Sequence, residues 1–165
     1  MIKLLGRAKR VGDKISAMVS PAFVADTSIL SGVNDVFNSV FVRGNAVGDV
    51  MFYGRGAGKF PTASAVVSDM LDCALNIGAT IPIRWSDETM ELSDPALNSS
   101  RFFVRIPRTE LEKASGLFRG FEEVSMDSAP SDEAAFTTGR MKESSFEDCA
   151  AQLSEVRQVI RLLED

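Results

Sequence analysis

The chain has 165 residues, of which 45% are hydrophobic, and it carries a formal net charge of −5 with a sequence pI near 4.9. A chain of this length buries roughly 70% of the surface that its unfolded form exposes, which allows one solid core or two small ones. The acidic balance argues against a nucleic-acid-binding protein, which needs clustered Lys and Arg on one face. The sequence contains no histidine, which excludes a catalytic imidazole and an imidazole-bound zinc ion.

The sequence also gives no sign of a membrane segment. No apolar run approaches the ~20 residues of a membrane span, and the N-terminus lacks the apolar region of a signal peptide. We therefore expect a cytoplasmic protein that binds neither membrane nor nucleic acid. Cys73 and Cys149 each fall in an apolar helical pattern, so we predict buried free thiols and no disulfide.

Two β-hairpins are predicted at the start of the chain. Residues 2–8 and 15–24 have the composition of strands and flank a loop of about four residues, 11–14. Residues 36–42 and 47–53 form the second pair around residues 43–46. The first hairpin holds a basic cluster, for which a solvated strand face is the better interpretation than a nucleic-acid footprint: Lys3, Arg7, Lys9, Arg10 and Lys14.

A glycine corner, defined here as Gly54, Gly56 and Gly58, follows the second hairpin and leads into a helix predicted over Thr62–Asn76. Glycine takes positive φ readily and lets a ligand or another segment approach the bare backbone. The helix carries one broad apolar stripe at helical spacing: Ala63, Val66, Val67, Met70, Leu71 and Ala74. Some other surface must receive this stripe, and Gly78 is the expected end of the helix.

The second half of the chain has a regular pattern after a linker rich in proline and acidic residues. Strands are expected at 101–106, 124–128, 134–138 and 157–163. Two helices are expected to open on the capping boxes Thr109-x-x-Glu112 and Ser144-x-x-Glu147. The order is βαββαβ, the arrangement of a ferredoxin-like domain, and the fold class is therefore α+β.

The residues alone do not identify a catalytic site. The G-x-G-x-G spacing differs from the dinucleotide fingerprint, and by spacing alone a structural turn is favoured over a ligand site. The carboxylates are scattered, and no Ser-x-x-Lys occurs. No catalytic residue and no metal ligand is predicted in this chain.

The segment VNDVFNSVFVRGNAVGDVMFYGRGAGKFPTASAVVSDMLD, Val33 to Asp72, strongly resembles the end of the catalytic region of bacterial homoserine dehydrogenases. IKLLGRAKR and SPAFV before it fit the same region. The resemblance implies an oxidoreductase that interconverts L-homoserine and L-aspartate 4-semialdehyde with NAD(P)H, in threonine and methionine biosynthesis. Gly58 occupies the position of the family glycine that contacts the nicotinamide cofactor, and Gly54 and Gly56 are expected to shape the loop.

The resemblance also implies a domain organisation. Residues 1–78 are expected to be the last part of the catalytic region, residues 79–98 a linker, and residues 99–165 an ACT-like regulatory or dimerisation domain. The family's N-terminal Rossmann domain and its D-x-x-x-K motif with the catalytic lysine are missing from this sequence. We therefore expect no cofactor binding and no activity from this chain alone. In that case the helical stripe of residues 62–76 is uncovered within one monomer or covered by self-association.

An alternative is an ACT-like binding module that senses an amino acid, most plausibly threonine, and forms a homodimer without catalysis. Effector-binding ACT modules usually carry an acidic residue and a Pro-Gly pair at the first strand-to-helix turn. The corresponding turn here, IPRTELEKASG in residues 106–116, lacks that pair, which argues against effector binding but leaves dimerisation unaffected. A purely structural domain is a third interpretation, against which the long match argues.

Overall fold

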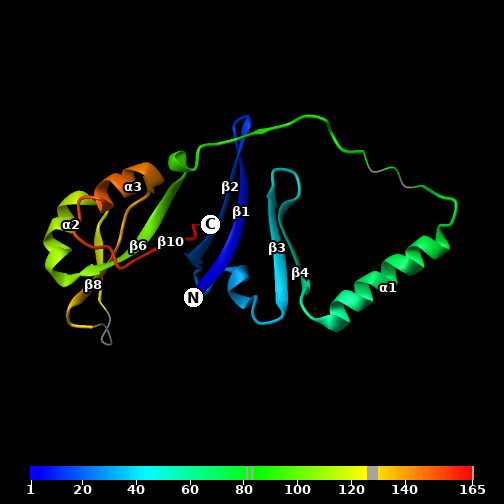
Figure 1. The fold of residues 1–165 in the computed structure, drawn as a ribbon, viewed down its shortest axis with the longest axis horizontal. Helices are drawn as coiled ribbons and strands as arrows, with labels where there is room; N and C mark the ends of the chain where they lie inside the picture. Colours follow the sequence, from blue (N-terminus) through cyan, green and yellow to red (C-terminus); the bar gives the residue numbers. More distant parts are fainter. Residues whose placement is uncertain (81, 83, 126–129, 165) are drawn as a thin grey trace. The chain divides into compact units, whose positions relative to one another are not determined.

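A computed structural model describes residues 1–165 except 81, 83, 126–129 and 165. The chain forms two compact units: residues 1–25 together with 89–165, and residues 26–88 (Figure 1). Both helices and strands are present, so the predicted mixed α and β fold is confirmed. Within the residues that the structure describes, no helix combines the length and apolar character needed to cross a bilayer.

The first unit begins with a long β-hairpin. β1 (Ile2–Val11) and β2 (Lys14–Phe23) pair in antiparallel fashion from Ile2 opposite Phe23 to Val11 opposite Lys14. The loop is thus two residues and not four, because Gly12, at φ 62°, takes the left-handed conformation that so tight a turn requires.

The same unit contains the predicted βαββαβ segment. Its elements are β6 (Ser99–Pro107), α2 (Leu111–Leu117), β7 (Glu122–Val124), β8 (Glu133–Thr137), α3 (Glu143–Ala150) and β10 (Gln158–Leu162). The four strands run in the order β10-β6-β8-β7 with every neighbouring pair antiparallel, as in a ferredoxin-like sheet. Two short strands lie off this path: β5 (Glu91–Leu92) pairs with β2, and β9 (Met141–Lys142) pairs with β6.

The structure divides the chain differently from the expected boundaries at residues 78 and 98. Strand β2 pairs in parallel with β10, with Arg161 opposite Ala22, so the N-terminal hairpin extends the ferredoxin-like sheet. Part of the expected linker also belongs to this unit, because β5 and the 3-10 helix η2 (Pro95–Leu97) lie within residues 89–165.

The core of this unit lies between the sheet and its two helices. Alternate residues of β6, namely Phe102, Val104 and Ile106, are fully buried against Ala114 and Phe118 from the α2 region and Phe146 of α3. The ring of Phe102 stacks on that of Phe146 at 4.1 Å between centroids. The predicted alternation of β6 is confirmed, and it assigns one face of the sheet to the helices.

Both predicted capping boxes are wrong. Thr109 lies inside a 3-10 turn, η3 (Arg108–Glu110), and α2 follows without a side-chain cap. Helix α3 begins at Glu143, one residue before the predicted cap Ser144. The Glu143 N–H donates to the Asn98 carbonyl at 2.8 Å, and its carboxylate forms a bidentate ion pair with Arg161, so tertiary contacts fix this helix start.

The second unit contains a β-hairpin and a long helix. After η1 (Ile29–Gly32), β3 (Phe37–Gly44) and β4 (Gly48–Arg55) pair in antiparallel fashion. Each strand starts one residue later and ends two residues later than predicted. Helix α1 (Lys59–Leu75) begins three residues earlier than predicted, and Gly78 beyond its end has φ 85°.

The apolar stripe of α1 is uncovered, as predicted. Val66, Val67, Met70 and Leu71 are all more than half exposed, and no residue of the helix is buried. Cys73 on the same helix is exposed and Cys149 is half-buried. Both thiols are free, but the prediction that they are buried is wrong. Cys73 is exposed because, among the described residues of its unit, no surface covers the helix that carries it.

Candidate functional site

The glycine corner connects the end of β4 to the start of α1. Gly58 is the N-cap of the helix, with φ 108° and ψ 155°, a region of backbone conformation that essentially only glycine occupies. Its carbonyl accepts hydrogen bonds from the Thr62 N–H at 3.2 Å and the Thr62 hydroxyl at 3.0 Å. The first turn of α1 is therefore anchored on the backbone of Gly58.

The start of α1 presents backbone donors without intrahelical partners. An α-helix leaves its first N–H groups unbonded within the helix, and here these belong to Lys59 and Phe60, since Pro61 has none. No side chain caps them, because Gly58 has no side chain. These donors and the positive end of the helix dipole favour a negatively charged group beside Gly58.

The three glycines of the corner differ in the structural constraint that favours glycine at each position. A Cβ on Gly56 would overlap the side-chain amide of Asn38, which lies directly against it. A Cβ on Gly54 would meet nothing within 4 Å. Positive φ, which any of the three could adopt, occurs at Gly58 alone among them.

A shallow, open hollow of about 280 Å³ lies on the β3–β4 hairpin next to the corner. It is lined by Asn38, Ser39, Val40, Phe52, Tyr53, Gly54, Arg55 and Gly56. The register places Asn38 opposite Gly54, which brings the Asn38 amide to the first part of the corner. Gly58 itself is not part of the hollow's lining.

An aromatic and cationic stack stands at the same end of the hairpin. The rings of Phe37 and Tyr53 stack at 4.8 Å, and the Arg55 guanidinium lies 5.4 Å from the centre of the Phe37 ring. Sequence analysis did not single out Asn38, Phe37 or Arg55, because their neighbourhood depends on strand register. The register that pairs Phe37 with Arg55 is the feature that would have revealed this neighbourhood.

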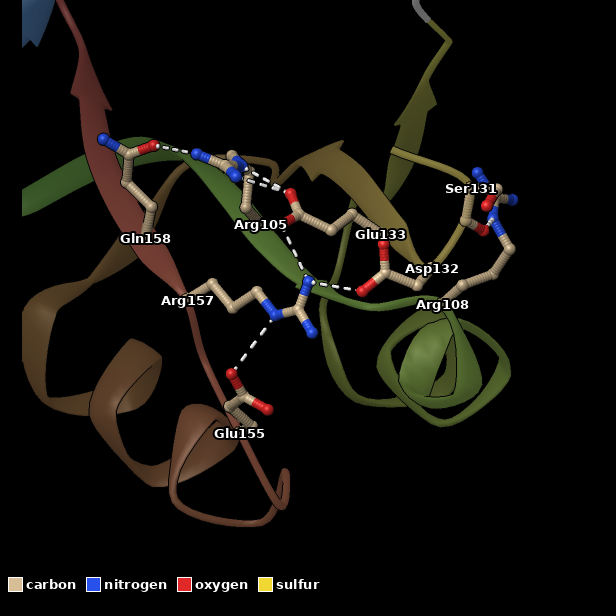
Figure 2. Close-up of polar contacts among 8 residues, drawn as sticks. All are labelled: Arg105, Arg108, Ser131, Asp132, Glu133, Glu155, Arg157 and Gln158. Atoms are coloured by element: carbon tan, nitrogen blue, oxygen red, sulfur yellow. Dashed lines mark hydrogen bonds and ion pairs between the residues drawn. The ribbon is translucent and has the colours of Figure 1, made fainter. Parts of the chain in front are cut away.

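A second polar cluster belongs to the first unit and joins three strands of the ferredoxin-like sheet (Figure 2). Glu133 of β8 accepts a hydrogen bond from Arg105 of β6 at 3.0 Å and another at 2.7 Å from Arg157, which directly precedes β10. Arg157 also bonds Asp132, and Arg105 bonds Gln158. Hydrogen bonds from Arg105 and then Arg157 lower the pKa of Glu133, and the bond to Glu133 raises the pKa of Arg157.

The turn after β6 uses its own polar groups internally. The carboxylate of Glu110 accepts a hydrogen bond from the Ser154 hydroxyl at 2.8 Å and another from the Ser154 N–H at 3.3 Å, which lowers the pKa of Glu110. The Arg108 N–H donates to the Asp132 carbonyl at 2.8 Å. The Glu110 carboxylate and the Arg108 N–H are thus bonded within the domain.

Residues 1–71 match the family model described as homoserine dehydrogenase. The chain is 49% identical over 76 residues to homoserine dehydrogenase of Bacillus subtilis, a match that covers 46% of this chain and 18% of that protein. It is 45% identical over 110 residues to the Mycobacterium bovis enzyme, covering 62% of this chain and 25% of that protein. The glycine corner and the N-terminal hairpin both lie inside the matched family segment.

Solved structures extend the likeness over nearly the whole chain. A homoserine dehydrogenase from S. aureus covers 99% of this chain with a TM-score of 0.69 at 30% identity. One from Thiobacillus denitrificans covers 99% with a TM-score of 0.75, and its 24% identity supports the fold alone. This chain spans 42% of each of those chains, and its matches span about a fifth to a quarter of the curated relatives.

Proposed function

We propose that this chain, whose residues 1–71 match the homoserine dehydrogenase family model, acts as the C-terminal portion of such an enzyme. The reaction is the NAD(P)-dependent interconversion of L-homoserine and L-aspartate 4-semialdehyde, a step of threonine and methionine biosynthesis in the cytoplasm. The observation that carries the proposal is the glycine-only backbone of Gly58 at the start of α1, within the matched segment.

In this proposal Gly58 forms one wall of the cofactor site. The absence of a side chain lets the nicotinamide end of NAD(P) approach the backbone closely, and the N–H groups of Lys59 and Phe60 favour a nearby negative charge. The cofactor supplies hydride transfer when bound. The opposite wall and the catalytic lysine belong to the N-terminal portion of the family's fold, against which the exposed stripe of α1 packs.

The test uses the chain co-expressed with the portion of the S. aureus enzyme that it does not span. Gly58→Ala should lower kcat/KM for NADPH by about 100-fold, because an alanine Cβ and a changed backbone displace the cofactor from its reacting position. Gly32→Ala is the matched control, since a Cβ there meets nothing within 4 Å and the residue lacks a positive φ. Equal activity of the Gly58→Ala and Gly32→Ala assemblies would contradict the role of Gly58.

For residues 99–165 we propose an ACT-like domain that pairs with a second copy in a homodimer. The order β10-β6-β8-β7 with α2 and α3 on one face supports this assignment. The internal bonding of Glu110 and Arg108 favours a dimerising role over amino-acid sensing. A threonine titration distinguishes the two: a sensing domain gains about 2.7 kcal/mol at 100 times its Kd, and a dimerising domain shows no thermal shift.

A further inference from the structure

The hollow beside the glycine corner has a floor of bare backbone. Directly paired residues of a hairpin share one of its faces. The pairs Asn38–Gly54 and Val40–Phe52 therefore lie on the same face, and the Asn38 amide leans along the hairpin against Gly56. All five of these residues line the hollow. Since Gly54 and Gly56 have no side chains, the hollow is the space that side chains at these two positions would fill.

The other lining residues direct their side chains to the opposite face of the hairpin. Ser39 pairs with Tyr53, and Phe37 pairs with Arg55, so these four alternate with the residues of the hollow. The stacked rings of Phe37 and Tyr53, with the Arg55 guanidinium over the Phe37 ring, lie on that opposite face. Among the described residues that line the hollow, Asn38 is thus the one whose polar side chain faces it.

The walls of the hollow are apolar and open to a ligand. Val40 is 61% exposed and Phe52 is 64% exposed. None of the described lining residues is acidic, so a ligand that carries phosphate groups meets no carboxylate there. Apolar walls with a few polar groups that fix orientation are typical of sites for small organic ligands. A glycine floor between such walls suits a flat ring.

The Asn38 amide is not used inside the chain. A primary amide has two N–H donors and an acceptor oxygen, and no hydrogen bond between described residues involves those of Asn38. Other amides of the chain are used internally: the Asn98 oxygen accepts from the Ser16 hydroxyl at 2.7 Å, and the Asn76 amide donates to the Asp72 carbonyl at 2.9 Å. Contact with Gly56 therefore places the Asn38 amide and leaves its donors and acceptor for a ligand.

The ligand that fits these features is a flat ring that bears a primary amide, because two primary amides can each donate an N–H to the other's oxygen. The nicotinamide ring of NAD(P) has this chemistry. We propose that Asn38 is a cofactor-binding residue whose side-chain amide hydrogen-bonds the carboxamide of the nicotinamide ring. The inference rests on the proposed function and adds to Gly58 a residue that fixes the orientation of the ring, on which hydride transfer depends.

The test measures cofactor binding by isothermal titration calorimetry. The protein is this chain co-expressed with the portion of the S. aureus enzyme that it does not span. The ligands are NADP⁺ and its 3-acetylpyridine analogue, in which a methyl group replaces the carboxamide NH₂. The wild-type assembly should bind NADP⁺ about fivefold more tightly than the analogue, which cannot donate to Asn38.

Asn38→Ala should remove this preference. The variant should bind NADP⁺ about tenfold more weakly than the wild type does, and it should bind NADP⁺ and the analogue within about twofold of each other. Gly56→Ala should reduce the preference too, because its Cβ displaces the Asn38 amide. Asn45→Ala is the matched control, since Asn45 is exposed in the turn at the other end of the hairpin. Circular dichroism of each purified chain confirms that the variants fold.

The possible failures are distinguishable. If the wild-type assembly binds both ligands equally, or if Asn38→Ala keeps the preference or weakens both ligands by the same factor, the inference is overturned. Turnover by that wild-type assembly would still support the proposed function. A wild-type mixture that yields no assembly, or an assembly that binds neither ligand, contradicts the proposed function and this inference with it.

Discussion

Two glycines of the corner are constrained by different causes. At Gly58 the constraint is torsional, since φ 108° with ψ 155° is closed to other residues although a Cβ would lie 3.7 Å from the nearest atom, Cδ of Pro61. At Gly56 the constraint is contact with Asn38. Because a flexible amide can move, we expect Gly56 to tolerate a methyl group more readily than Gly58.

In the ferredoxin-like domain, the backbones of Gly120 and Gly139 pack closely against each other. Gly120 has φ 65°, and a Cβ built on it lies 2.7 Å from Cα of Gly139, whose N–H donates to the Arg119 carbonyl. Backbone cannot yield as a side chain does, so Gly120→Ala should cost about 1–3 kcal/mol of unfolding free energy. Urea denaturation measures this cost.

Gly116→Ala is the control for that experiment. Gly116 lies inside α2 with open space around its Cβ position, so alanine there should be neutral or stabilise by roughly 0.5–1 kcal/mol. If Gly120→Ala and Gly116→Ala show the same denaturation midpoint, the close contact between Gly120 and Gly139 does not contribute as described.

Among the elements, strands were predicted more accurately than helix starts. The alternation of residues 101–106 reflects burial of one sheet face, and burial is written in the sequence as hydrophobicity. Helix starts at Glu143 and Leu111 depend instead on partners distant in sequence, such as Asn98 and Arg161 for Glu143. A strand was predicted over residues 124–128, whereas β7 (Glu122–Val124) ends at Val124. Residues 126–128 of the predicted strand lie outside the described residues.

The candidate site was likewise predicted only in part. The glycine corner and its helix were found from local sequence, and the role of Gly58 was assigned by resemblance. The hollow beside the corner could not be found so, because Asn38 reaches Gly56 only through the pairing of β3 with β4. Pairing register depends on cross-strand contacts that a single-strand pattern does not encode.

The Glu133 cluster links β6, β8 and the start of β10, and it predicts how stability depends on pH. The pKa of Glu133 is lower in the folded chain than its ordinary value of 4.5, owing first to Arg105 and then to Arg157. The unfolded chain therefore takes up the proton first as pH falls. The folding stability that the ionised Glu133 contributes is fully present above about pH 4.5. It is lost as the pH falls through the lower pKa of Glu133 in the folded chain.

Glu133→Gln should reduce this acid sensitivity. The variant should unfold at a lower temperature than the wild type at pH 7, and the difference should shrink as the pH is lowered below 4.5. Thermal melts at a series of pH values measure both. Glu164→Gln, which removes an exposed ion pair with Arg140, is the control with little expected effect. A constant difference between wild type and Glu133→Gln at all pH values would contradict the assignment.

In the whole molecule, the N-terminal hairpin joins the C-terminal domain, which sequence analysis placed elsewhere. The joining contact is the parallel pairing of Arg161 with Ala22 and Leu162 with Phe23. These segments lie near opposite ends of the chain, and no periodicity within either segment specifies such a pairing. The family match over residues 1–71 therefore crosses from the first structural unit into the second.

The two units should differ in their response to core truncation. Phe136 is fully buried and contacts the rings of Phe118 and Phe121, so Phe136→Ala should cost about 3–5 kcal/mol of unfolding free energy. Phe52 is 64% exposed on the second hairpin, and Phe52→Ala should change the stability by less than about 0.5 kcal/mol. Chemical denaturation followed by circular dichroism compares them, and a similar cost for both would show that Phe52 is covered in solution.

The central claim, that this chain is one portion of a homoserine dehydrogenase, is tested most directly by NADPH oxidation in the presence of L-aspartate 4-semialdehyde. We predict no turnover above background for the purified 165-residue chain, and measurable turnover when it is co-expressed with the portion of the S. aureus enzyme that it does not span. Robust turnover by the chain alone, or a stable assembly with no turnover, would contradict the claim.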